Sequence, residues 1–237
     1  MRKQIPNALT LTNLFCGCMA IVCALHFKFV PVVWLIAIAF VADALDGQVA
    51  RWLNVSSPIG KQLDSLADMV SFGVLPGMII YSLLIKSFGI ATPDVLIVEA
   101  APAFILSVFA GYRLGKFNID TRQSDTFLGL ATPACTVLVA GIMLIYHFGT
   151  VEVKAMIANK SFLYALIIVL SFLMVSDLPL LNFRFPHYRW KGNKARWIFI
   201  IGLPIIALVT GYAFFALAVV WYVLVSMLEL LNQRLYA

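Results

Sequence analysis

Four aspartates in a short window of this sequence have the types and spacing to do chemistry. Asp43 and Asp46 are three residues apart, and Asp64 and Asp68 are four apart, so each pair shares one face of a helix. Turn-forming residues between the pairs predict neighbouring antiparallel helices whose carboxylates converge. Because converging carboxylates repel one another, we expect cations among them. Oxygen ligands without nearby His or Cys favour Mg²⁺ or Mn²⁺, and Ca²⁺ can occupy such a site too.

Small residues and a cation beside the aspartates indicate chemistry at a phosphate. Gly47, Ala50 and Gly60 leave room for a bulky phosphate or nucleotide close to the backbone. Arg51 falls on the same helix face as Asp43 and supplies a cation for phosphate oxygens. Two metal ions about 3.5 to 4 Å apart are a known arrangement for displacement at phosphorus. The pattern therefore predicts an enzyme that holds divalent ions, two of them in this arrangement, against a pyrophosphate-linked substrate.

The composition places these residues in a membrane protein. Of the 237 residues, 62% are hydrophobic and 12% are charged, whereas soluble proteins carry about 25% charged residues. Stretches long enough to cross a bilayer predict an all-α, polytopic protein with about eight transmembrane helices, near 8–27, 31–53, 61–85, 94–115, 126–147, 160–180, 196–212 and 214–232.

The basic residues predict the orientation. Alternating spans put 13 of the 17 Lys and Arg on the amino-terminal side and 4 on the other, and cytoplasmic loops are the ones enriched in Lys and Arg. The aspartates should therefore face the cytoplasm of a multi-pass protein of the cell membrane. The net charge of +6 then faces anionic membrane lipids, and no nucleic-acid partner is expected.

Two other interpretations of the aspartates stay open. In the first, they only pair with Arg51 and Lys61 at the membrane edge, without a ligand. In the second, they line the path of a cation or proton transporter, because acidic residues inside membrane helices often serve transport. The transporter gives no role to the small residues Gly47, Ala50 and Gly60.

The window also resembles a family signature. It reads Asp43-Ala-Leu-Asp46-Gly47-Gln-Val-Ala50-Arg51, then eight residues, Gly60, three residues, Asp64, three residues and Asp68. This spacing is similar to that of the CDP-alcohol phosphatidyltransferases, whose fold has a six-helix catalytic core. The resemblance implies that all four aspartates ligate metal and that Asp68 is also the general base.

The resemblance extends to the lipid substrate and to the domain organisation. It implies CDP-lipid contacts at Gly47, Arg51, Ser57, Asn7 and Thr10; for the last three, helix capping or a loop position is the alternative interpretation. It implies one integral membrane domain, residues 1–237, with a catalytic core of about 1–180 and two extra helices at about 196–232. Homodimers are usual in such families, and we expect one here.

Two further segments are similar to the membrane-embedded phosphatidylserine synthases within that family. They run from Tyr112 to Asn118 and from Phe127 to Ala134. The resemblance implies transfer of a phosphatidyl group from CDP-diacylglycerol to L-serine, which yields phosphatidylserine and CMP. Serine needs a cation for its carboxylate, and Arg113 is available for it, unless Arg113 only sets the topology. Glycerol 3-phosphate and an inositol phosphate are the alternative acceptors, and these would call for more basic residues.

Overall fold

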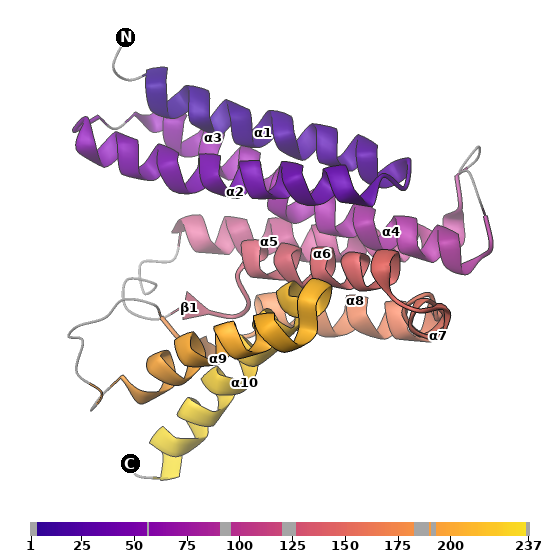
Figure 1. Ribbon diagram of the computed structural model, residues 1–237. Coiled ribbons are helices and arrows are strands. Elements are labelled where there is room, and N and C mark those ends of the chain that lie inside the picture. Colours follow the sequence, from indigo (N-terminus) through magenta and orange to yellow (C-terminus); the bar gives the residue numbers. More distant parts are fainter. Residues whose placement is uncertain are drawn as a thin grey trace.

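The structure is a computed structural model that describes residues 4–55, 57–90, 96–119, 127–182, 190 and 193–235. Helices make up nearly all of this part (Figure 1). The elements are α1 (Gln4–Leu25), α2 (Phe29–Trp52), α3 (Pro58–Asp68), a π-helix (Met69–Val74), α4 (Leu75–Ser87), a 3₁₀-helix (Val98–Phe104), α5 (Ile105–Ile119), β1 (Phe127–Leu128), α6 (Thr132–Phe148), α7 (Val151–Ile157), α8 (Lys160–Val175), β2 (Pro179–Leu180), α9 (Lys194–Thr210), a 3₁₀ turn (Gly211–Ala213) and α10 (Phe214–Leu235).

The prediction of an all-α, polytopic membrane protein is confirmed. Four described segments are long and apolar enough to span a bilayer, and a fifth counts if α7 and α8, bent by 53°, form one span. The four are Gln4–Leu25, Phe29–Trp52, Pro58–Ser87 and Lys194–Asn232. Each of the eight predicted spans corresponds to a helical segment, but α6, with 17 residues, is a shorter apolar helix. Of the predicted cytoplasmic cations, Arg2, Lys3, Arg122, Arg184, Arg189 and Lys191 lie outside the described residues.

The last apolar segment folds back on itself. Gly211 has φ +52°, a left-handed conformation that glycine adopts at little cost, and it ends α9. A Cβ on Gly202 would lie 2.3 Å from Nε1 of Trp221, so α9 and α10 pack closely side by side. Figure 1 shows the hairpin of α9 and α10; the start of α1 and the end of α10 both lie toward the left of this view, in the top and bottom layers.

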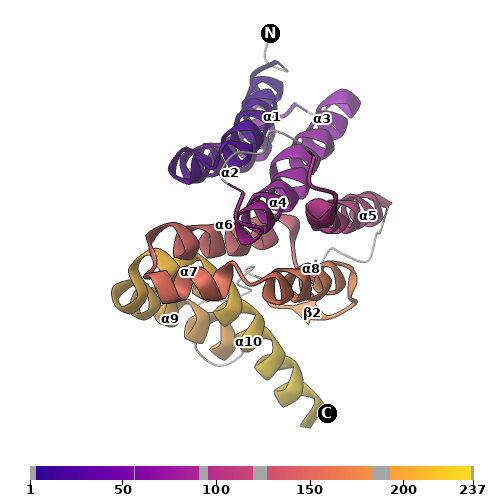
Figure 2. The ribbon, with the colours of Figure 1, turned by 90° about the vertical axis from the view of Figure 1, so that its right-hand side faces the viewer.

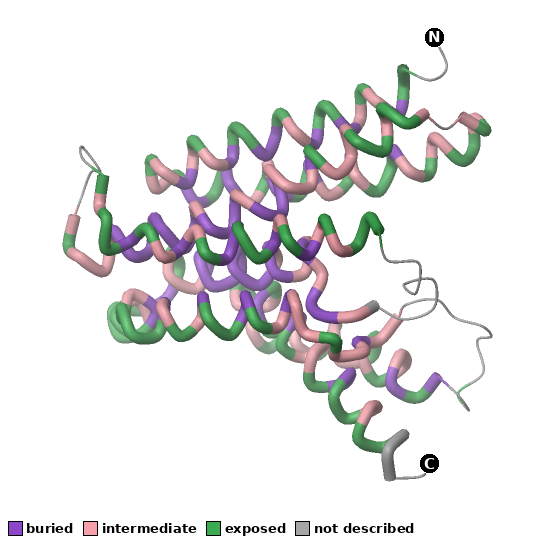
Figure 3. The backbone as a smooth tube through the Cα atoms, turned by 180° about the vertical axis from the view of Figure 1, so that it is seen from behind, coloured by how far each residue is buried: buried purple, intermediate pink, exposed green. Residues whose placement is uncertain are grey.

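The helices form successive layers around a buried centre. The antiparallel pair α1 and α2 lies on one side, α4 and α6 form the middle, and α8, α9 and α10 lie beyond them (Figures 1 and 2). Burial is concentrated on the middle layer (Figure 3), where ten residues of α4 are buried. Their packing fixes α4, and with it the helix that precedes it.

The helix that carries Asp64 and Asp68, α3, begins at a capping residue and is followed by a π-helix that packs against α1. Ser57 caps α3, since its Oγ accepts a hydrogen bond from the backbone N–H of Gly60 at 3.0 Å. After Asp68 the chain continues through the π-helix into α4. A Cβ on Gly17 of α1 would lie 2.3 Å from Oγ of Ser71 on the π-helix, so these two helices are in close contact. Short π-helical segments are frequent at functional sites.

Candidate active site

Three carboxylates from two helices meet at one point. Asp43 on α2 and Asp64 and Asp68 on α3 each offer an oxygen, and these oxygens all lie within 4.8 Å of one another. The carboxyl groups of Asp43 and Asp68 are within hydrogen-bonding reach. The sequence-based expectation that carboxylates from adjacent helices converge is met by these three side chains.

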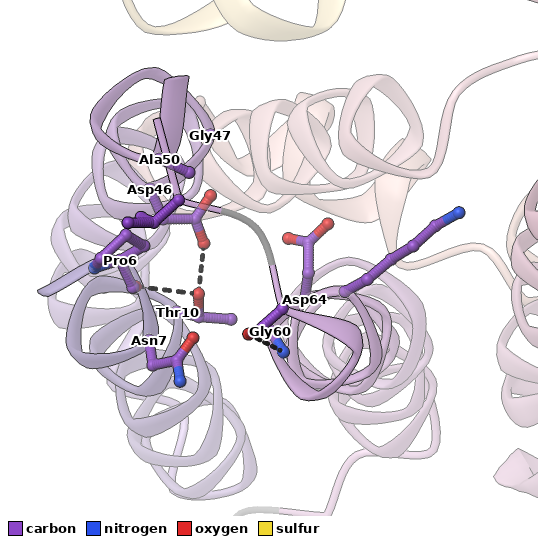
Figure 4. Close-up of a pocket in the computed structure, with 11 residues that line it drawn as sticks. Pro6, Asn7, Thr10, Asp46, Gly47, Ala50, Gly60 and Asp64 are labelled. Carbon is purple, nitrogen blue, oxygen red and sulfur yellow. Dashed lines mark hydrogen bonds between the residues drawn. The ribbon is translucent and has the colours of Figure 1, made fainter. Parts of the chain in front are cut away.

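Asp46, the remaining aspartate of the signature, is oriented differently. Its Oδ2 accepts a hydrogen bond from the Thr10 hydroxyl, which also contacts the backbone oxygen of Pro6 (Figure 4). It lies outside the group of three but lines, with Asp64, the pocket beside that group. Asp64 therefore belongs both to the group of three carboxylates and to the lining of the pocket.

The pocket beside the cluster contains most of the residues assigned to the CDP-lipid. The ends of α1, α2 and α3 surround it (Figure 4). Its lining residues are Pro6, Asn7, Thr10, Asp46, Gly47, Ala50, Val55, Ser57, Gly60, Lys61 and Asp64. Arg51 is not in the lining, but a Cβ on Gly47 would lie 3.8 Å from its Nη1, so its guanidinium lies beside the pocket wall.

Gly60 is needed for the shape of this pocket. A Cβ at this position would lie 2.9 Å from Oγ of Ser57 and 3.0 Å from Oδ1 of Asn7. The missing side chain therefore lets Asn7 and Ser57 approach the start of α3. Asn7 and Ser57, which the sequence relates to the site only by family resemblance, are thus brought close to Gly60.

Two residues of the site were missed in the sequence. Asn13 is fully buried, and its Nδ2 lies 3.4 Å from Oδ1 of Asp68. Lys61 lines the pocket, although the sequence suggested it only as a possible ion-pair partner. The available signals were a polar amide inside an apolar first span and a lysine directly after Gly60.

Arg113 lies in a different pocket. Its side chain is 8% exposed, and its Nε has no hydrogen-bond partner among the described residues. This second pocket is lined by Tyr112, Arg113, Lys116, Leu128, Met174, Val175 and Ser176. The structure does not bring Arg113 into the lining of the pocket that Asp46 and Asp64 share.

The donor set fits divalent metal ions. Three carboxylate oxygens at this separation are hard ligands that suit Mg²⁺ or Mn²⁺. Within the described part of the chain, neither Arg51 nor Lys61 forms an ion pair with any of the four aspartates, so no ion pair with these two residues offsets the mutual repulsion of the carboxylates. The arrangement suits a substrate whose phosphates fill the pocket and share cations with the carboxylates.

Known proteins resemble the chain over most of its length. The profile of the CDP-alcohol phosphatidyltransferase family matches residues 3–231. A CDP-diacylglycerol–serine O-phosphatidyltransferase of Helicobacter pylori is 36% identical over 214 residues, 86% of this chain and 80% of that protein. The proteins of the same name from Bacillus subtilis and Saccharomyces cerevisiae are 32% and 34% identical, over 82% and 59% of this chain and 99% and 53% of their own length. The chain belongs to the CDP-alcohol phosphatidyltransferase family.

Proposed function

We propose that this membrane protein transfers the phosphatidyl group of CDP-diacylglycerol to the hydroxyl of L-serine, giving phosphatidylserine and CMP. The observation that carries the proposal is the convergence of Asp43, Asp64 and Asp68 beside a pocket formed by α1, α2 and α3. Similarity to serine-specific relatives over most of the chain supports the choice of acceptor.

The residues at the cluster would hold divalent cations and the diphosphate together. Asp43, Asp64 and Asp68 would ligate one ion, and Asp46 and Asp64 would reach a second. Mg²⁺ or Mn²⁺ bound there would neutralise the charge on the diphosphate and on the departing CMP. Gly47, Ala50 and Gly60 leave the space for the nucleotide, and Arg51 adds a positive charge at its edge.

Asp68 would act as the general base. The serine oxygen attacks the phosphorus that carries the diacylglycerol, the phosphoanhydride bond breaks, and CMP leaves with its electrons. Asp68 takes the proton of the serine hydroxyl as the new P–O bond forms. Asn13, fully buried behind this carboxylate, donates to its Oδ1 and so fixes the direction in which the other oxygen points.

The membrane supplies one substrate and the cytoplasm the other. The diacyl tails stay in the bilayer, whereas serine and the CMP product are water-soluble. The excess of Lys and Arg on the amino-terminal side supports a cytoplasmic site. In this proposal residues 1–237 form one domain, with a catalytic core of about 1–180, and the protein is a homodimer.

Arg113 would bind the carboxylate of serine. Its unpartnered Nε beside a pocket supports this role, because a buried guanidinium without an anion is costly and carboxylates pair with it well. Among the described residues, acceptors that carry a phosphate would have only Arg113 and Lys116 as cations in that pocket.

One assay tests the proposal. Purified protein is incubated with CDP-diacylglycerol, Mn²⁺ or Mg²⁺ and a panel of alcohols, and CMP release is measured. Serine should support the fastest release. Preference for glycerol 3-phosphate or an inositol phosphate would reassign the acceptor, and no release with any alcohol would contradict an enzymatic function and favour a transporter.

A further inference from the structure

An apolar groove lies along α2, on the N-terminal side of the aspartates. α2 contributes Val33, Ile36, Ala37 and Phe40 to its lining, and α6 and the start of α10 contribute the rest. Its cavity volume is about 330 Å³, and sites that hold small molecules usually measure about 300 to 1,000 Å³. Every described side chain that lines the groove is apolar. Because Ala37 is exposed, the groove opens to the bilayer, and it suits a hydrocarbon.

The groove and the proposed active site share one face of α2. Steps of four and three residues along the helix connect Ile36, Phe40, Asp43, Gly47 and Ala50, and residues at this spacing lie on one face. Ile36 and Phe40 line the groove, whereas Gly47 and Ala50 line the pocket beside the metal cluster. The two cavities therefore follow one another along α2, with Asp43 between them.

The length of the groove matches the depth of one lipid leaflet. Val33 precedes Asp43 by ten positions, and a helix rises 1.5 Å per residue, so the two lie about 15 Å apart along α2. The hydrocarbon core of a bilayer is about 30 Å thick, which gives each leaflet about 15 Å. An acyl chain whose diphosphate headgroup is held at Asp43 would therefore run beside this part of α2.

The end of the groove farthest from the aspartates lies at α6 and α10. The ring of Phe29, at the start of α2, packs edge-on against that of Tyr146, near the end of α6, with centroids 6.1 Å apart. A Cβ on Gly141 of α6 would lie 2.3 Å from the backbone nitrogen of Ala216. α10 thus begins against this part of α6, which lies between α2 and the hairpin of α9 and α10 (Figure 2). Phe215, the residue before Ala216, adds its ring to the groove there.

We infer that the groove binds one acyl chain of the lipid substrate and that Phe215 limits the length of the chain that fits. The inference rests on the proposed function and deepens it. It gives α10, which the sequence places outside the catalytic core, a part in selecting the lipid. Since lipid tails are as apolar as the groove, a chain that moves between them gains no hydrophobic free energy. Van der Waals fit therefore decides which chain binds, and an aromatic ring at the end of the groove sets that fit.

The first test measures equilibrium binding of two CDP-diacylglycerols to the full-length protein in detergent, without serine. Ala37→Phe narrows the groove and should weaken binding of the dipalmitoyl lipid about threefold, the usual strength of one packing contact in lipid. The dihexanoyl lipid should bind as before: its chains extend about 6 Å, and Ala37 lies about 9 Å from Asp43 along α2. The control is Ala207→Phe, at an exposed position of α9 outside the groove lining, which should bind both lipids like the unaltered protein.

The second test measures binding of lipids with saturated chains of 10 to 20 carbons to Phe215→Ala. An aromatic ring occupies about 5 Å in a packed pair, and an extended chain covers about 1.2 Å per bond. The chain length that binds best should therefore increase by about four carbons. The same preferred length in Phe215→Ala and the unaltered protein would overturn the inference.

Two other results would contradict it. An equal loss of affinity for both lipids in Ala37→Phe would show that the substitution disturbs the headgroup site. A changed oligomeric state of Ala37→Phe, measured by light scattering, would assign the groove to a contact between two copies of the chain. If the unaltered protein binds both lipids but releases no CMP with serine, the proposed acceptor is wrong, whereas the assignment of the groove is not affected.

Discussion

The side-chain amide of Asn13 on α1 lies 3.4 Å from Oδ1 of Asp68 on α3 and donates a hydrogen bond to it. Asn13 is fully buried, and its backbone oxygen accepts a hydrogen bond from Ser71 at 3.0 Å, on the π-helix that follows Asp68. Two hydrogen bonds thus connect α1 to this region: one goes to the side chain of Asp68, the proposed base, and the other comes from the π-helix that follows it.

Asn13→Ala should lower kcat by about tenfold, because Asp68 loses the donor that sets its orientation. The KM for CDP-diacylglycerol should change little, since Asn13 is not among the residues that line the pocket beside the cluster. Steady-state CMP release measures both values. A changed KM with normal kcat would show that Asn13 serves substrate binding and not the base.

Asp68→Asn should abolish turnover and leave CDP-diacylglycerol binding largely intact. The amide keeps the size of the carboxylate but cannot accept the proton of serine. Turnover is measured by CMP release and binding by equilibrium titration with the lipid. Glu152→Gln, an exposed acid at the start of α7, is the control and should behave as the unaltered protein. Full activity in Asp68→Asn would remove its assignment as the base.

Removal of divalent metal should stop CMP release, and Mn²⁺ or Mg²⁺ should restore it. Metal should also raise the melting temperature of the protein in detergent, because an ion at 100 times its Kd adds ~2.7 kcal/mol to stability. Asp43→Asn and Asp64→Asn each remove one of the three converging carboxylates. They should therefore abolish the metal-dependent rise in melting temperature; a rise of the same size in both variants would place the metal elsewhere.

The spacing of the aspartates was enough to predict most of the cluster. Residues three or four apart share a helix face, and the turn-forming residues after Arg51 imply that the next helix returns beside it. The convergence of Asp43, Asp64 and Asp68 follows from these two facts. The different orientation of Asp46 does not, because it depends on Thr10, a residue 36 positions away on another helix.

Contacts between distant segments account for the rest of what sequence reasoning missed. Asn13 and Asp68 are separated by 55 residues, and Leu181 and Tyr222 by 41. No local periodicity encodes such pairs. The apolar spans predicted the helices well, but the hydropathy pattern does not show which faces meet or that the chain changes to a π-helix after Asp68.

Gly60→Ala should raise the KM for CDP-diacylglycerol. The added Cβ would lie 2.9 Å from Oγ of Ser57 and 3.0 Å from Oδ1 of Asn7, so at least one of these polar groups must move. Alanine is otherwise the better helix former by about 1 kcal/mol. The substitution should therefore stabilise the helix while it weakens binding of the lipid. Gly115→Ala on α5, where a Cβ meets nothing within 4 Å, is the matched control. An equal response of both variants would exclude a specific role for Gly60.

Arg113→Lys should raise the KM for serine by about tenfold, since a lysine keeps the charge but loses Nε and the planar fork that matches a carboxylate. The comparison is Arg51→Lys, at the other pocket. The Arg51 guanidinium lies beside Gly47. Arg51→Lys should therefore raise the KM for CDP-diacylglycerol and leave the KM for serine unchanged. If each variant raises the KM of only one substrate, serine is assigned to the pocket of Arg113 and CDP-diacylglycerol to the pocket beside Arg51. If Arg113→Lys leaves the serine KM unchanged, Arg113 does not bind the acceptor, and the positive charge in the second half of α5 then serves only to set the orientation of that helix in the membrane.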